Sequence, residues 1–82
     1  MTDQEMVRRA FIALGIMLST ETPAPAEMGI GLKILAETRA EFPNLAGMVL
    51  MYRLAIQIEL LYGTQRNAEY IKANILPWFP LA

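Results

Sequence analysis

The sequence predicts an all-α fold, a small bundle of three main helices followed by a short C-terminal helix and an irregular aromatic tail. Apolar residues recur at intervals of three and four through most of the 82 residues, which is helical spacing. Prolines and glycines interrupt this spacing at a few places, where helices stop. One 18-residue stretch, from Leu45 to Tyr62, is apolar almost all the way round a helix. We expect a single domain over residues 1–82, with helices at about 3–19, 24–41, 44–62 and 65–76 and a tail at 77–82.

The first helix is expected to begin after Thr2. Thr2 and Glu5 have the spacing of a capping box, in which the threonine oxygen accepts from the Glu5 amide and the glutamate reaches back. The core-facing stripe consists of residues at helical spacing, Val7, Phe11, Leu14 and Leu18. Ile12 and Ile16 fall on the far side of this helix, where a lone helix would expose them.

The second helix should follow the linker at residues 19–25. Pro23 and Pro25 disfavour helical geometry in the residues before them, so the first helix must end earlier. The apolar stripe of the second helix is Met28, Leu32 and Leu35. Gly29 and Gly31 each weaken its start by about 1 kcal/mol relative to alanine. Either they allow close backbone packing, or the regular helix begins nearer Gly31.

The central helix, capped by Asn44, has two apolar faces. One face carries Leu45, Val49, Tyr52 and Ile56. The nearly opposite face carries Leu50, Leu54, Ile58 and Leu61. A chain this short has little material to cover a helix on both sides. We therefore expect oligomerisation to complete the bundle.

The last helix should begin after Gly63, a helix-ending signal, with Thr64 as its cap. Its inward residues are expected to be Ala68, Ile71 and Ile75. The tail at 77–82 then carries the aromatic residues Trp78 and Phe79. It either folds over the chain's own core or docks on a partner, since aromatic residues are common binding anchors.

The composition favours a protein that works by contact with other proteins. Hydrophobic residues make up 55% and charged residues 18%, and such an apolar excess in a small chain is usually hidden in an oligomer or complex. We expect a small helical adaptor, chaperone or inhibitor that binds itself as a homodimer, a larger protein, or both. The predicted interface is Ile12, Ile16, Leu50, Leu54, Ile58, Leu61, Trp78 and Phe79. On this interpretation, Leu54→Glu disrupts the complex without unfolding the helices.

Arg53 and Glu59 interrupt the apolar stretch. Each charge either reaches the helix edge and meets solvent, or forms an ion pair between chains that sets the register of a dimer.

The residue inventory argues against catalysis. Cysteine and histidine are absent, which removes thiolate nucleophiles, the commonest general base and the commonest transition-metal ligand. Glu37 and Glu41 share a helix face, but such pairs are routine on solvated surfaces. We expect no enzyme activity, no catalytic residues, no metal and no cofactor.

Two other classes of function remain open. A small phage or mobile-element regulator that binds nucleic acid, or a nucleic-acid-processing complex, would use Arg8, Arg9, Arg66 and Lys72. The net charge of −1 disfavours it, because phosphate contacts normally leave a basic stripe. A membrane-associated protein is disfavoured by the charges of the central helix, each costing about 2.5–3.5 kcal/mol at mid-bilayer. We expect a cytoplasmic location.

Overall fold

A computed structural model of the chain describes residues 1–79 and shows them as helices joined by loops. The elements are α1 (Asp3–Ala13), α2 (Pro25–Glu41), α3 (Gly47–Tyr62), α4 (Ala68–Ile75) and the short 3₁₀ helix η1 (Leu76–Trp78). No residue in this part of the chain is in a strand. The all-α prediction is therefore confirmed, and residues 80–82 of the predicted tail lie outside the described residues.

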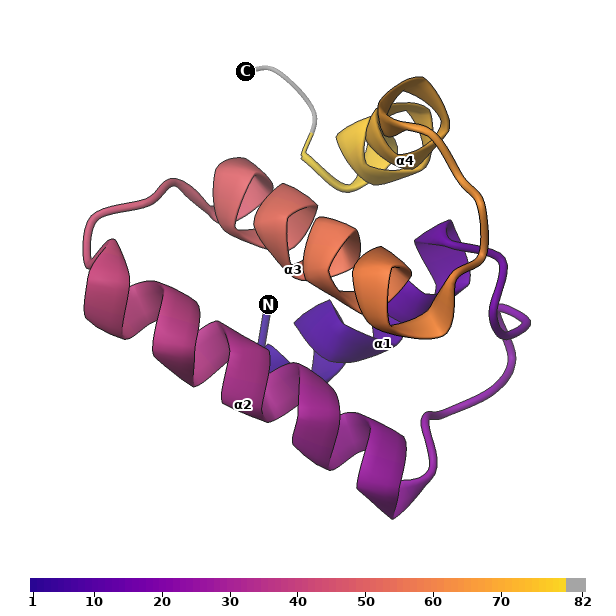
Figure 1. Cartoon of the computed structure of the whole chain (residues 1–82), viewed down its shortest axis with the longest axis horizontal. Coiled ribbons are helices and arrows are strands. Elements are labelled where there is room, and N and C mark those ends of the chain that lie inside the picture. Colours follow the sequence, from indigo (N-terminus) through magenta and orange to yellow (C-terminus); the bar gives the residue numbers. More distant parts are fainter. Residues whose placement is uncertain (80–82) are drawn as a thin grey trace.

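Helix α3 is the centre of the fold. It packs against α1, α2 and α4, with α2 and α4 on opposite sides of it (Figure 1). All four α-helices contribute to the core, whose largest fully buried side chains are Val7, Phe11, Leu14, Leu35, Met51, Leu54, Ile58, Ile71 and Ile75. The radius of gyration is 11.7 Å, close to the value of about 12 Å for a compact domain of this length. The chain's own helices thus bury the face of α3 that carries Leu50, Leu54 and Ile58.

Helix α1 begins as predicted and ends six residues early. The Glu5 amide donates to Thr2 Oγ1 at 3.1 Å. After Ala13 the chain turns at Gly15, whose φ is +73°. The Gly15 amide donates to the Ile12 carbonyl oxygen at 2.9 Å, and the Ile16 amide donates to that of Phe11 at 3.1 Å. This is a Schellman motif, which ends a helix.

The expectation that α1 continues to residue 19 is therefore wrong, because Gly15 adopts the left-handed conformation that closes the helix. Leu18, which the sequence placed in the core stripe, lies in the following loop with 69% of its surface exposed.

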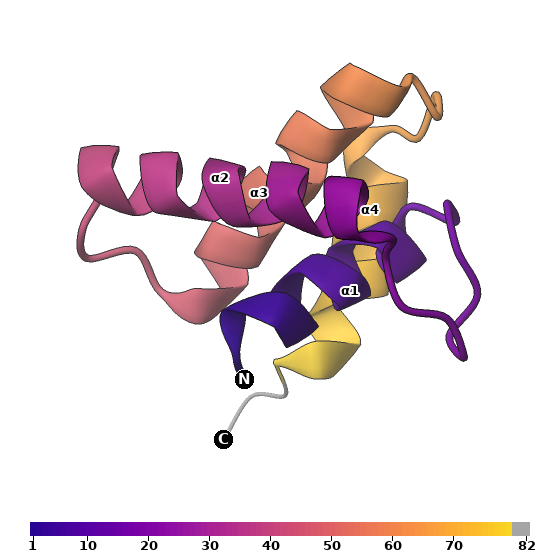
Figure 2. The same cartoon turned by 90° about the horizontal axis from the view of Figure 1, so that it is seen from below.

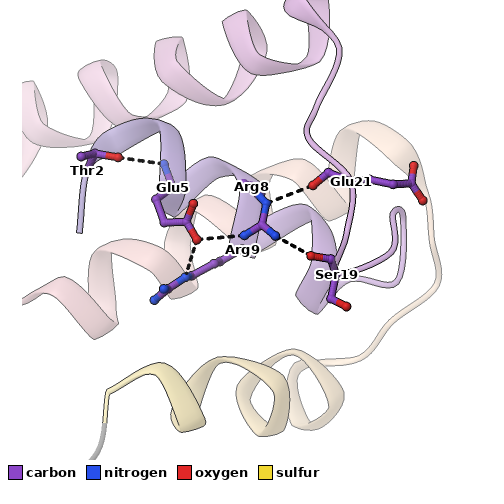
Figure 3. Close-up of polar contacts among 6 residues, drawn as sticks. All are labelled: Thr2, Glu5, Arg8, Arg9, Ser19 and Glu21. Atoms are coloured by element: carbon purple, nitrogen blue, oxygen red, sulfur yellow. Dashed lines mark hydrogen bonds and ion pairs between the residues drawn. The ribbon is translucent and has the colours of Figure 1, made fainter.

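Arg8 fastens this loop to α1. Its Nε donates to the Glu21 carbonyl oxygen at 3.0 Å, and its Nη2 donates to the Ser19 carbonyl oxygen (Figure 3). The Glu5 carboxylate accepts at 2.9 Å from Arg8 and at 2.9 Å from Arg9. The loop carbonyls are thereby paired with a cation that Glu5 neutralises.

The loop leads into α2, which crosses α1 (Figure 2). The two helices approach each other closely where Gly31 faces Val7. A Cβ atom at Gly31 would lie 2.4 Å from Val7 Cγ1, whereas one at Gly29 would have nothing within 4 Å. Gly31 is therefore the glycine of close packing, and α2 already begins at Pro25.

Helix α3 begins three residues later than predicted. Its N-cap is Ala46, without a side-chain cap, and Asn44 lies in the preceding turn. Leu45 packs against the core from the position before the N-cap, where an apolar residue fixes the entry angle of a helix. The prediction that Asn44 caps α3 is therefore wrong, because the helix begins only after Leu45 has packed against the core.

Helix α3 ends at Tyr62, before Gly63 with φ +63°, as predicted. The start of α4 differs, because Gln65 has φ +60° and cannot belong to a right-handed helix. The N-cap is Asn67, whose side chain accepts from the Tyr70 amide at 2.8 Å, and not Thr64. Helix α4 begins at Ala68. Ala68 is exposed and not inward as predicted, whereas Ile71 and Ile75 are buried as expected.

A bidentate ion pair joins the start of α1 to the end of α2. Arg39 Nη1 and Nη2 lie 2.6 Å and 2.8 Å from the two carboxylate oxygens of Asp3. These hydrogen bonds lower the pKa of Asp3 below its ordinary value and raise the pKa of Arg39.

The Asp3→Asn variant should be less stable than the wild type at pH 7, by about 0.2–1 kcal/mol because the pair is partly solvated. Since folding lowers the pKa of Asp3, the contribution is present above the unfolded pKa of about 3.9 and is lost as pH falls through the folded value. Urea unfolding from pH 7 to pH 2 should show the two proteins converging below about pH 4. The role of the pair would be refuted if the difference in the free energy of unfolding between the two proteins stayed constant to pH 2. It would also be refuted if Asp3→Asn caused the same loss in an Arg39→Gln background.

Candidate protein-binding groove

The structure corrects the predicted partner interface on α3. Leu50, Leu54 and Ile58 are 5%, 0% and 0% exposed and belong to the core of the chain. They are unavailable to a partner in this fold, because the other helices already cover them. Leu61, the fourth residue of that face, is 64% exposed near the end of α3.

The two isoleucines of the predicted interface are only partly accessible. Ile12 and Ile16 are half-buried, and Ile16 packs against the core. The helix that should have aligned them ends at Ala13, so they do not form one continuous face with α3.

The aromatic residues after α4 contact two other helices. The Arg9 guanidinium carbon lies 4.1 Å from the Trp78 ring centroid, which places Trp78 against α1. Phe79 packs against the core, and a Cβ atom at Gly47 would lie 3.1 Å from Phe79 Cε1. Residues 78 and 79 are therefore held between α1 and the start of α3.

Arg53 and Glu59 both have contacts within their own chain. The Arg53 guanidinium lies over the Phe42 ring at 4.5 Å. The Glu59 carboxylate accepts from the Thr64 amide at 3.0 Å and from the Thr64 hydroxyl, which closes the turn after α3. Neither contact involves an ion pair between chains, so a register-setting role stays a prediction.

An open hollow of about 310 Å³ lies between the first turns of α3 and the end of α4, and we call it the α3–α4 groove. Its lining residues are Met48, Val49 and Tyr52 from α3, Lys72 and Ile75 from α4, and Leu76 from η1. In Figure 1 these segments face each other across the side of α3 that is turned away from α2. The groove therefore uses the other apolar face of α3, opposite to the one that the sequence assigned to a partner.

The groove is apolar and accessible. Met48, Val49 and Leu76 are 36%, 40% and 42% exposed, while Ile75 is 1% exposed. Since a cavity of about 150 Å³ holds one benzene molecule, the groove has room for about two groups of that size. Such a lining can remove apolar groups of a ligand from water.

Among residues 1–79, Lys72 is the only charged residue that lines the groove. Within residues 1–79 it takes part in no ion pair of 4 Å or less. Its ammonium group is thus available to an anion at the edge of the groove.

A second, smaller hollow of about 180 Å³ lies between α2 and α3. It is lined by Ile34, Glu37, Thr38, Glu41, Arg53 and Gln57, and is mostly polar. Glu37 Oε1 lies 3.9 Å from Lys33 Nζ on the exposed face of α2, as expected of a solvated surface. The described residues contain no group of three or more acidic side chains placed to hold a metal ion.

The arginines that a nucleic-acid-binding protein would use have other contacts. Arg8 binds loop carbonyls and Glu5, and Arg9 binds Glu5 and contacts Trp78. Arg66 Nε donates to the Leu14 carbonyl oxygen at 3.2 Å, and its guanidinium lies over the Tyr70 ring at 4.4 Å. None of the helices in the described part of the chain combines the length and apolar content that a bilayer crossing requires.

The sequence held part of the signal for the groove. Val49 and Tyr52 stand on an apolar face of the central helix, and Ile75 and Leu76 are an apolar pair just before Pro77. Their meeting could not be inferred, because they come from segments more than 20 residues apart in sequence.

Comparisons of the chain with protein-family models, curated proteins and solved structures found no significant match.

Proposed function

We propose that this protein is a non-enzymatic protein-binding module that docks a partner in the α3–α4 groove. The observation that carries the proposal is an apolar, open groove on a chain whose core is complete without it. Exposed apolar surface with polar surroundings is typical of interaction sites. The module belongs to the class of small helical adaptors, chaperones and inhibitors.

The way the groove is built supports this proposal. The wall formed by Ile75 and Leu76 is followed at once by Trp78 and Phe79, which are held on α1 and at Gly47. A wall fixed at this end keeps the groove open before binding. Less conformational entropy is then lost when a partner docks.

Val49→Glu should weaken partner binding strongly and leave the fold intact. Val49 is 40% exposed, so the change should alter the free energy of unfolding by no more than about 0.5 kcal/mol. A carboxylate there would be buried unpaired against an apolar partner, which should weaken binding at least about tenfold, or 1.4 kcal/mol. Circular dichroism and thermal unfolding verify the fold, and binding is measured by cross-linking.

For the cross-linking, a photoreactive amino acid replaces Met48 at the groove or, as the control, Ala36 on the exposed side of α2. In a lysate of the native cells, a defined adduct should form from position 48, not from position 36, and should be lost with Val49→Glu. Equal adducts from both positions, or adducts that survive Val49→Glu, would contradict the proposal. An adduct between two copies of this chain, with a dimer mass by light scattering, would show that the partner is the protein itself.

A further inference from the structure

The charge at the edge of the α3–α4 groove indicates what kind of segment binds there. We propose that the occupant is an amphipathic helix of a partner protein with two apolar anchors one turn apart and a carboxylate beside them that pairs with Lys72. This inference rests on the proposed protein-binding function and adds the chemistry of the partner.

The shape of the groove fits a helix. Its walls are formed by two helices, α3 and the end of α4, and a third helix commonly lies along such a groove with its apolar face inward. Helical ligands of this kind insert side chains at positions i and i+3 or i+4. The volume of about 310 Å³ accepts about two benzene-sized groups, which corresponds to two such anchors.

The negative charge proposed for the partner follows from the positive charge of Lys72. Lys72 lines the groove and is exposed, and a lysine in such a position keeps its ammonium group in water. Glu69, three residues earlier on α4, forms no ion pair of 4 Å or less with Lys72. A partner carboxylate therefore meets an uncompensated cation, whereas a partner lysine or arginine beside the anchors meets like charge, which selects against it.

The test is a selection from a displayed library of helix-forming peptides of about 16 residues, a little over four turns. Apolar residues are fixed at i, i+3, i+4 and i+7, and the positions between them are random. The library is selected separately against the wild-type protein, Lys72→Glu and Val49→Glu. Lys72 is exposed, so its replacement should leave the fold unchanged, which circular dichroism verifies.

Peptides selected by the wild type should carry Asp or Glu at a constant offset from the anchors, and those selected by Lys72→Glu should carry Lys or Arg there. A selected acidic peptide should bind Lys72→Glu about two- to fivefold more weakly than the wild type, as expected of one exposed ion pair.

The possible failures are distinguishable. Peptides that bind the wild type and not Val49→Glu would show that the groove is a binding site. If those peptides have no preference for Asp or Glu, or if Lys72→Glu selects the same sequences as the wild type, the charge inference is overturned. If selection against the wild type yields no more peptides than selection against Val49→Glu, the helical occupant is overturned, and the cross-linking experiment then decides the proposed function.

Discussion

Leu54→Glu should unfold the protein, whereas Leu61→Glu should leave it folded. Leu54 is 0% exposed in the core, and Leu61, on the same face of α3, is 64% exposed. Truncating a buried leucine already costs about 2–5 kcal/mol, and an unpaired buried carboxylate adds a desolvation cost. Total stabilities of about 5–15 kcal/mol are usual, and a chain of this size falls at the low end.

Far-ultraviolet circular dichroism and urea unfolding measure both variants. We expect lost helical signal for Leu54→Glu and a free energy of unfolding within about 0.5 kcal/mol of the wild type for Leu61→Glu. If Leu54→Glu yields too little protein, Leu54→Ala should still show a loss of about 2–5 kcal/mol. The sequence alone predicted the opposite for Leu54→Glu, a broken complex with intact helices. That result, a folded Leu54→Glu protein, would show that Leu54 lies on the outside.

Alanine at the two glycines of α2 should have opposite effects. Gly29→Ala should stabilise the protein by about 0.5–1 kcal/mol, because alanine is the better helix former and its methyl group meets nothing within 4 Å. Gly31→Ala brings the same propensity gain but places Cβ 2.4 Å from Val7 Cγ1 and 3.1 Å from Val7 Cβ. Val7 is fully buried and stiff at χ1, so α1 and α2 must move apart. This should lower the free energy of unfolding by about 1–3 kcal/mol.

Urea unfolding of the two variants under identical conditions measures the difference, which should be at least about 1 kcal/mol. A Val7→Ala change provides the control, because it removes the two methyl groups that collide with the new Cβ. The double variant Val7→Ala, Gly31→Ala should be more stable than the sum of the two single effects predicts. Additive effects, or a Gly31→Ala protein as stable as Gly29→Ala, would show that α1 and α2 do not touch at this position.

Two features of the sequence predict different ends for α1. The helical spacing of apolar residues continues through Met17 and Leu18, which predicted a helix to residue 19. Gly15 was the local signal for an earlier end, since a glycine after a helix commonly takes the left-handed conformation. Spacing alone cannot show that Leu18 follows a turn, so it was assigned to the core although it is exposed.

The sequence by itself determined the helical class and several helix boundaries, because these depend on neighbouring residues. Thr2 caps α1, Pro25 is the first residue of α2, and Gly63 ends α3. These features act through hydrogen bonds and backbone angles that reach only a few residues along the chain.

Only the tertiary structure decided which face of α3 is inside. Both faces are apolar, so hydrophobicity could not choose between them. The choice depends on where α1, α2 and α4 pack, that is, on contacts between residues far apart in sequence. The same packing buries Leu54, exposes Val49 and brings Lys72 beside the first turns of α3. The α3–α4 groove exists only after the chain has folded, because no single segment contains it.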